Sequence, residues 1–361
     1  MAYLNTDEVE DVIISKSNNY SSLSKIIELP KTSVEGRKIH AIIIGKNKDN
    51  KSHDSILFTG GMHAREWGTS DICVSFASDI LEAYSLNTGL RYGNKYFNAE
   101  QIKKIVERVN LIILPDVNPD GKAYSQSDPR RRLWRGNRHL ENPSCYGVDL
   151  NRNFDFLWDF RKYFFPRARI RTSDDPCHPD QIYRGTSAFS EPETQNVKLL
   201  MDEHEGIGHH IDIHGVIGEF YHNWGNDENQ TSDPEMNFTS SVYDRKRGVN
   251  GSDEYSEYIS DEDLNHVTSL SKIFQDAVYE ANNNKYRVTQ AFGLYCTSGA
   301  SDDYSYSRHF RDHSKKICGF TVEFGVGEVS FQPPWDKMKK YIVEVSSGLV
   351  AFCYDVSEEL Q

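Results

Sequence analysis

Apolar runs typical of β-strands alternate along this chain with longer segments that carry a helical repeat, and this alternation limits the possible folds more than any other feature. The strand-like runs cover residues 39–44, 55–59, 109–114, 208–213 and 317–324. The helix-like segments cover residues 69–84, 99–108, 191–205, 263–282 and 334–354. Strands that alternate with helices favour an α/β fold, with a largely parallel or mixed sheet and helices on both faces.

The chain shows no linker and no internal repeat, so we expect a single domain over residues 1–361. Ser190 and Glu193 have the spacing of a capping box and predict the start of the third helix. The segment of residues 226–263 is polar and acidic, and we expect it to be a surface insertion. A solvated loop is the main interpretation of this segment, and a lid that faces the substrate is the alternative.

The overall charge limits the possible partners. Asp and Glu total 54 against 41 Lys and Arg, which gives a formal net charge of -13. Nucleic acid binding requires basic contacts to phosphate, so we expect no nucleic acid partner. No apolar run reaches transmembrane length, and we expect no membrane partner. The N-terminal residues lack a basic segment followed by an apolar one, so we expect no signal peptide in this chain, although one could have been removed.

The six cysteines divide into two groups. Cys145 and Cys177 lie in loop-like stretches, and a disulfide that closes the loop between them would indicate an oxidising compartment, such as that of a secreted protein. The other four lie in apolar runs, where we expect buried free thiols. They are Cys73, Cys296, Cys318 and Cys353.

A possible metal site follows the second strand-like run. Gly60 and Gly61 end this run, and His63 and Glu66 follow within a few residues. Glycine permits a tight turn, and a catalytic zinc takes three protein ligands of these types with one open position. His214 directly follows another strand-like run and is the best candidate for the third ligand. The alternative for His63 and Glu66 is a solvated ion pair at the start of a helix.

Other segments carry more polar chemistry than turns require. Arg135 ends a basic stretch, and the adjacent Asn151 and Arg152 form a pair suited to a planar carboxylate. Tyr295 precedes a small-residue loop that could form the floor of a pocket. Glu323 follows Phe320, Thr321 and Val322 near the end of the last strand-like run, where a carboxylate beside a zinc could take a proton from water.

Taken in order, these segments, the Asn-Pro-Asp-Gly sequence at 118–121 and the C-terminal helix resemble the zinc metallocarboxypeptidases of the pancreatic carboxypeptidase A/B family. The resemblance spans most of the chain. It implies a single-domain α/β fold with a central, twisted, mixed and mostly parallel eight-stranded sheet, flanked by helices on both faces. It also implies a monomer with one Zn²⁺ per chain. No segment precedes the catalytic region, so we expect no inhibitory pro-segment in this chain.

The resemblance implies a role for each candidate at the reaction centre. His63, Glu66 and His214 would bind zinc. Glu323 would be the general base toward the water that attacks the scissile carbonyl, and then the general acid. Arg135 would stabilise the oxyanion. The implied activity is hydrolysis of the C-terminal peptide bond of peptides and proteins.

The same resemblance implies a binding site for the substrate's terminal residue. Asn151, Arg152 and Tyr295 would hold its carboxylate, and Arg65 would assist binding. Phe331 matches an aromatic residue that lines the cleft, although the stretch just before it departs from the family in length and composition.

Asp302 lies in the small-residue loop of residues 298–304, at the family position that faces the side chain of the C-terminal residue. An acidic residue there is typical of the branch that cleaves C-terminal Lys and Arg. Burying an unpaired carboxylate is costly, so a pocket with Asp302 at its base should favour a cation. The alternative is that Asp302 or Asp303 faces solvent or caps a helix. Specificity would then be broader or apolar.

Two other functions are compatible with the scaffold. A zinc amidohydrolase or deacylase would keep the metal ligands but lose the pair that binds the carboxylate, so Asn151, Arg152 and Tyr295 argue against it. A peptide-binding module without catalysis would be expected to have lost a metal ligand or the general base. All four of these residues are present, namely His63, Glu66, His214 and Glu323.

Overall fold

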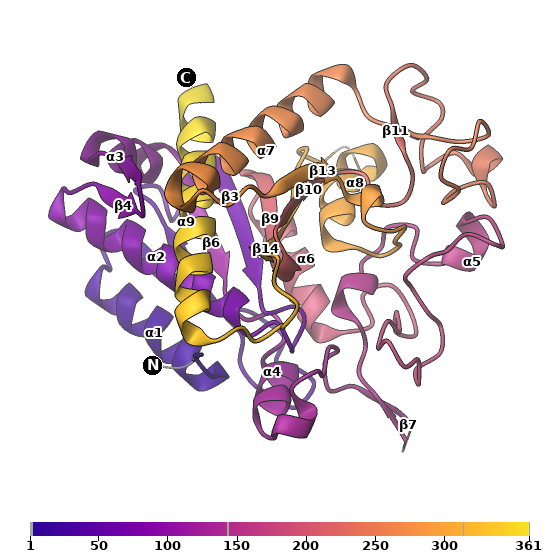
Figure 1. Cartoon of the computed structure of the whole chain (residues 1–361), viewed down its shortest axis with the longest axis horizontal. Coiled ribbons are helices and arrows are strands. Elements are labelled where there is room, and N and C mark those ends of the chain that lie inside the picture. Colours follow the sequence, from indigo (N-terminus) through magenta and orange to yellow (C-terminus); the bar gives the residue numbers. More distant parts are fainter. Residues whose placement is uncertain (1–2, 143, 313, 361) are drawn as a thin grey trace.

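The computed structural model describes residues 3–142, 144–312 and 314–360, and its centre is a mixed eight-stranded sheet (Figure 1). In spatial order the strands are β1 (Ser24–Glu28), β2 (His40–Ile44), β6 (Asn110–Leu114), β3 (Ser55–Gly60), β9 (Ile207–Ile217), β14 (Cys318–Val326), β10 (Glu219–His222) and β13 (Arg287–Gln290). The central pairs from β6 through β3 and β9 to β14 are parallel, as are β10 and β13. The predicted α/β fold with a mixed, mostly parallel sheet is therefore confirmed.

Helices cover both faces of this sheet. The α-helices described are α1 (Thr6–Asn19), α2 (Gly68–Leu86), α3 (Ala99–Arg108), α4 (Pro119–Gln126), α5 (Phe160–Tyr163), α6 (Pro192–Glu203), α7 (Asp261–Asn282), α8 (Ser301–Asp312) and α9 (Trp335–Glu359). On β9, His209 packs against Phe352 of α9, whereas its neighbour His210 contacts Ser305 of α8. Successive side chains of a strand point to opposite faces, so α8 and α9 lie on opposite sides of the sheet.

The central strands carry the apolar core. Every residue of β3 and β6 is buried. Parallel strands that are buried on both faces read as continuous apolar runs, which is why the sequence pattern locates them. The edge strand β13 is partly exposed, and its neighbour β10 has only four residues, so neither forms such a run. The smaller two-stranded sheets pair β4 (Leu90–Tyr92) with β5 (Lys95–Phe97), β7 (Leu140–Asn142) with β8 (Cys145–Tyr146), and β11 (Asn229–Gln230) with β12 (Glu257–Tyr258).

Three local predictions are wrong. The capping box at Ser190 does not form, because α6 begins at Pro192 with Glu191 as its N-cap. Glu193 is instead buried and accepts hydrogen bonds from Val34 N and Asn137 Nδ2. The strands β9 and β14 do not end at His214 and Glu323 but continue to Ile217 and Val326, because these segments pair with each other. The predicted loop of residues 298–304 ends at Ala300, where α8 begins.

The acidic segment of residues 226–263 has an interior of its own. Its last residues form the first turn of α7, and it contains the short helix η3 (Ser241–Tyr243). The Glu257 side chain is fully buried and accepts hydrogen bonds from Tyr255 Oη and Asn226 Nδ2, each at 2.6 Å, and from Phe238 N at 2.8 Å. Burial raises the pKa of Glu257 to about 7. Acidic composition therefore does not make the whole segment solvent-exposed.

The predicted disulfide is present. Cys145 and Cys177 are bonded, with their Cα atoms 5.1 Å apart and 32 positions of sequence between them. Cys73, Cys296, Cys318 and Cys353 are buried free thiols, as expected. Within the part of the chain that the structure describes, no helix is long and apolar enough to cross a membrane. The prediction about a signal peptide concerns the N-terminal residues, and the first two of these, Met1 and Ala2, lie outside the described residues.

Candidate active site

The turn that carries His63 and Glu66 connects β3 to α2, as the glycine pair predicts. Gly61 has a φ of +72°, and a Cβ there would lie 2.7 Å from Asp116 Oδ1, so this position requires glycine. Gly61 N donates to Thr69 Oγ1 at 2.9 Å, which ties the turn to the first turn of α2. The backbone thus directs both candidate ligands toward one end of the sheet.

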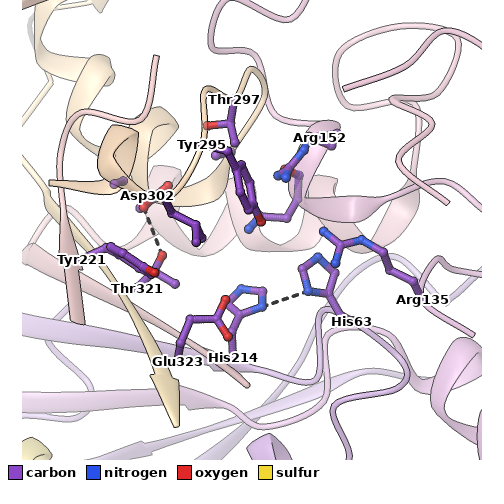
Figure 2. A pocket seen from close by; sticks show the side chains of 14 residues that line it. His63, Arg135, Arg152, His214, Tyr221, Tyr295, Thr297, Asp302, Thr321 and Glu323 are labelled. Carbon is purple, nitrogen blue, oxygen red and sulfur yellow. Dashed lines mark hydrogen bonds between the residues drawn. The ribbon is translucent and has the colours of Figure 1, made fainter. Parts of the chain in front are cut away.

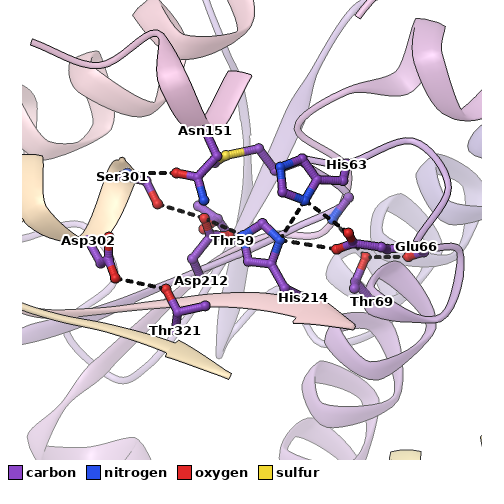
Figure 3. A network of polar contacts seen from close by, with 12 residues as sticks. Thr59, His63, Glu66, Thr69, Asn151, Asp212, His214, Ser301, Asp302 and Thr321 are labelled. Carbon is purple, nitrogen blue, oxygen red and sulfur yellow. Dashed lines mark hydrogen bonds and ion pairs between the residues drawn. The ribbon is translucent and has the colours of Figure 1, made fainter. Parts of the chain in front are cut away.

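Three buried side chains converge at this end of the sheet (Figure 3). His63 Nδ1 lies 3.0 Å from Glu66 Oε1 and 3.0 Å from His214 Nδ1. Glu66 Oε2 lies 3.1 Å from His214 Nδ1. His214 comes from β9, 151 residues away from His63 in the sequence. The structure therefore brings together the three residues that the sequence analysis selected as metal ligands.

Carboxylates lie behind both imidazole rings. Asp149 Oδ1 is 3.2 Å from His63 Nε2, and Asp212 Oδ2 is 2.9 Å from His214 Nε2. A carboxylate at Nε2 favours the tautomer with its proton there, which leaves the Nδ1 lone pair free for a metal. Two Nδ1 acceptors and the Glu66 carboxylate then face a common point. This donor set fits zinc, which binds nitrogen and oxygen ligands and keeps one position open in catalytic sites.

The charges of the cluster favour a cation at the same point. Burial lowers the pKa of His63. Burial also opposes the charged form of His214, but Asp212 and Glu66 outweigh it and raise the pKa of this imidazole. A bound cation would compete with protons for these nitrogens, because metal ligands must be deprotonated.

Glu323 lies in the register position of β14 directly opposite His214 of β9. It lines the same cavity as His63 and His214 (Figure 2). Burial and the nearby Glu66 charge raise the pKa of Glu323 to about 8. A carboxylate with a pKa near neutrality is suited to accept and return a proton.

Arg135 is held against the candidate metal ligands by Asp149. Arg135 Nε donates to Asp149 Oδ2 at 2.8 Å, while the other oxygen of Asp149 faces His63. Burial opposes the charge of Arg135, but Asp149 and its other negative neighbours hold its pKa above the ordinary value. One buried carboxylate therefore positions a candidate ligand and a permanent positive charge next to each other.

Asn151 and Arg152 lie in the short helix η2 (Leu150–Arg152), and both line the cavity. Asn151 Oδ1 accepts from Ser301 N at 2.8 Å, so its Nδ2 donor is the group available to a ligand. Arg152 Nε donates to Arg171 O at 2.5 Å, which fixes the guanidinium. Tyr295 also lines the cavity and lies between Arg152 and Asp302 in Figure 2.

Asp302, and not Asp303, faces the cavity. Asp302 Oδ2 accepts from Thr321 Oγ1 at 3.0 Å, and burial raises the pKa of this carboxyl. Asp303 is fully buried elsewhere, where its carboxylate accepts from Asn223 Nδ2 and Gly225 N at 3.0 Å each. In Figure 2, Asp302 lies at the opposite end of the cavity from Arg135 and Arg152. The cavity is therefore positive at one end and acidic at the other.

Arg65 and Phe331 are not among the residues that line this cavity. They contact each other instead, with the Arg65 guanidinium carbon 4.2 Å from the centroid of the Phe331 ring. Arg65 Nε is buried and has no hydrogen-bond partner among the described residues. The structure thus pairs these two residues but does not bring them to the cavity wall.

Sequence reasoning did not select several residues of the site. Asp149 and Asp212 orient the histidines, and the signal that could have found them is a charged residue next to or inside an apolar run. The cavity wall also contains residues with no recognisable sequence signal. These are Tyr221, Ala291, Leu294, Thr297, Ala300 and Thr321.

Comparisons with known proteins relate the whole chain to one family. The family model described as zinc carboxypeptidase matches residues 9–347. Carboxypeptidase B of Astacus astacus is 26% identical over 308 residues, which are 84% of this chain and 82% of that protein. The protein named inactive metallocarboxypeptidase ECM14 of Arthroderma otae is 31% identical over 57% of this chain, and the match covers only 32% of its length.

A solved structure shares the fold. Bovine thrombin-activatable fibrinolysis inhibitor, in complex with tick carboxypeptidase inhibitor, has a TM-score of 0.71 with this chain at 20% sequence identity. The alignment covers 99% of this chain and 98% of that one. The same sheet and helices are therefore used over nearly the whole length.

Proposed function

Because this chain belongs to the zinc carboxypeptidase family, whose enzymes are hydrolases that act on peptide bonds, we propose that it removes the C-terminal residue of peptides and prefers Lys or Arg there. One observation carries this proposal: a single cavity is lined by two candidate metal ligands, two guanidinium groups and one buried aspartate. A zinc carboxypeptidase needs a metal site, a site for the terminal carboxylate and a site for the terminal side chain, and this cavity has residues for all three.

His63, Glu66 and His214 are the residues that would hold one zinc ion. When bound, zinc supplies a Lewis acid that polarises a carbonyl and lowers the pKa of water. Asp149 and Asp212 support this role, because each faces the outer nitrogen of one histidine. Groups of this kind hold the imidazole in the tautomer that metal binding requires.

Glu323 is the proposed general base and then general acid. As a base it takes the proton of the attacking water, and as an acid it returns a proton to the leaving amine. Arg135 is the proposed stabiliser of the oxyanion. Its guanidinium is buried and held by Asp149 before substrate binds, and donors fixed in advance stabilise developing charge without the cost of reorganisation.

Asn151, Arg152 and Tyr295 are the proposed site for the substrate's terminal carboxylate. A fixed guanidinium recognises a planar carboxylate through paired hydrogen bonds. Asp302 is the proposed partner of a Lys or Arg side chain at the other end of the cavity. Its buried carboxylate has Thr321 Oγ1 as its side-chain donor, so a cationic side chain would compensate for its burial. Arg65 remains a proposed substrate-binding residue, and Phe331 a proposed aromatic residue of the cleft.

The supporting experiment compares two blocked dipeptides, one ending in Arg and one in Phe, with and without a metal chelator. We expect faster turnover of the Arg substrate, loss of activity with the chelator and recovery on addition of Zn²⁺. Equal or faster turnover of the Phe substrate would overturn the preference for basic residues. Activity that is insensitive to the chelator would overturn the metal-dependent reaction, and no activity with either peptide would favour the silent binding module.

We further propose that the protein acts as a monomer in an oxidising compartment and that residues 226–263 are an insertion in one catalytic domain. The Cys145–Cys177 disulfide supports the compartment, because such bonds are rare where glutathione keeps thiols reduced.

A further inference from the structure

A second group of metal-binding side chains lies on the other face of the sheet. His209 of β9 and Cys318 of β14 are register partners, just as His214 and Glu323 are. His209 precedes His214 by five residues on β9, and Cys318 precedes Glu323 by five residues on β14. An odd offset places a side chain on the opposite face of a strand, and five residues span roughly 17 Å. The two pairs therefore belong to separate places in the molecule.

His266 completes this group from helix α7. Its Nε2 lies 3.0 Å from His209 Nε2, and the ligand atoms of His209, His266 and Cys318 all lie within 4.8 Å of one another. Within residues 3–142, 144–312 and 314–360, this is one of two such groups, and the other is the candidate catalytic site. The separation of the two nitrogens is the same as that between His63 Nδ1 and His214 Nδ1.

The chemistry of the group suits a zinc-class ion. Imidazole nitrogens and thiolates are typical ligands of structural zinc. In a tetrahedral site with zinc–nitrogen distances of about 2.05 Å, two ligand nitrogens lie about 3.3 Å apart. The Glu359 carboxylate lies 3.7 Å from His266 Nδ1, on the outer side of the ring. A carboxylate there favours the tautomer whose Nε2 lone pair points at a metal.

The surroundings leave room for a fourth ligand. The three side chains line a cavity of about 380 Å³. The lysines of this cavity wall are already paired, Lys315 with Asp54 and Lys316 with Asp263. Their positive charges are therefore compensated and would not strongly oppose a cation. Asp263 also accepts a hydrogen bond from Tyr306, so water is the expected fourth ligand.

We propose that His209, His266 and Cys318 form a second site for a zinc-class divalent ion, with water in the fourth position. Binding forms one metal–sulfur bond and two metal–nitrogen bonds, and the Cys318 thiol proton passes to solvent. Burial raises the pKa of this thiol to about 12, so the proton is present before the metal binds. The site would clamp α7 to β9 and β14. The alternative for the same geometry is a hydrogen bond between two neutral imidazoles beside a buried thiol.

Cobalt distinguishes the two interpretations, because only a thiolate ligand gives a sulfur-to-cobalt charge-transfer band in the near ultraviolet. The candidate catalytic site contains two histidines and a glutamate, so it cannot give that band. We expect the metal-free protein to show the band when two equivalents of Co²⁺ are added. The His63→Gln variant should keep the band, because it changes only the catalytic site.

Matched variants locate the band. Cys318→Ser should abolish it, while Cys353→Ser, which removes another buried free thiol, should leave it unchanged. His266→Gln, at a partly exposed position, should weaken Co²⁺ binding at least 10-fold and provides the same test if Cys318→Ser does not fold. The proposal is overturned if the normal protein binds Co²⁺ without the band, or if the band persists in Cys318→Ser.

Discussion

His214 and Glu323 lie opposite each other as register partners in the adjacent parallel strands β9 and β14. This pairing places a proposed metal ligand and the proposed base on the same side of the sheet at the same height. Because both side chains project from strands with many backbone hydrogen bonds, their separation is set by the sheet and not by a flexible loop. The reacting groups are thus positioned before substrate arrives.

Replacing Glu323 with Gln should separate metal binding from turnover. Gln keeps the shape of the side chain but cannot accept the proton, so kcat should fall by about 10²- to 10⁴-fold while zinc content is unchanged. Metal analysis and steady-state kinetics measure the two effects. Glu193→Gln is the matched control, since Glu193 is also buried but does not line the cavity. Activity retained in Glu323→Gln would exclude this residue as the base.

Replacing Asp302 with Asn should reduce the preference for basic residues. The variant keeps the hydrogen-bonding shape but loses the charge that faces the cavity, so kcat/KM for an Arg substrate should fall roughly 10²-fold, about 3 kcal/mol. The value for a Phe substrate should not fall. Asp303→Asn is the control, because Asp303 binds Asn223 and Gly225 and does not face the cavity. A parallel loss for both substrates in Asp302→Asn would contradict the assignment.

Replacing Asp149 with Asn should weaken metal binding and catalysis together. Asp149 is a positioning residue whose two oxygens face His63 and Arg135. Loss of such a carboxylate typically costs 10- to 100-fold in metal affinity, or about 1.4–2.8 kcal/mol. Competition with a chelator measures the affinity, and kcat should fall more than KM rises, because Arg135 is proposed to act on the oxyanion. Asp155→Asn, on the partly exposed ion pair with Arg311, should change neither quantity.

The contribution of Glu257 to stability should decrease as the pH rises from about 5 to 8. Burial raises the pKa of Glu257 to about 7 in the folded protein, above the ordinary value of 4.5. Its protonated form therefore stabilises the fold fully below about pH 4.5, and this contribution is lost as the pH rises through about 7, by on the order of 1–3 kcal/mol.

Glu257→Gln should flatten this dependence, because Gln is neutral throughout. Urea unfolding at several pH values gives the free energy of unfolding for each variant. The exposed Glu254 of the same segment offers a control, Glu254→Gln, that should keep the normal profile. The same slope in Glu257→Gln and in the normal protein would show that another buried carboxyl is responsible.

Elements with a strong local signal could be predicted from the sequence. Helix α3 is found at its predicted bounds, because Asn98 caps it and its apolar residues repeat along one face. The buried strands were located by their apolar runs. Strands β10 and β13 were missed, because four residues are too short a run to show a periodic pattern. Helix α8 was not predicted at all, because its first residues, Ser301, Asp302 and Asp303, are also typical of a loop.

For the site, the local sequence is enough to show which side chains are available and, through the glycine pair, that His63 and Glu66 share one turn. Long-range folding is needed to bring His214, 151 residues from His63, into the cluster, because strand register depends on pairing between distant segments. Folding also places Asp149 and Asp212 next to the outer nitrogens of the histidines and turns Asp302 rather than Asp303 toward the cavity. Cys318, predicted only as a buried thiol, meets His209 and His266 for the same reason.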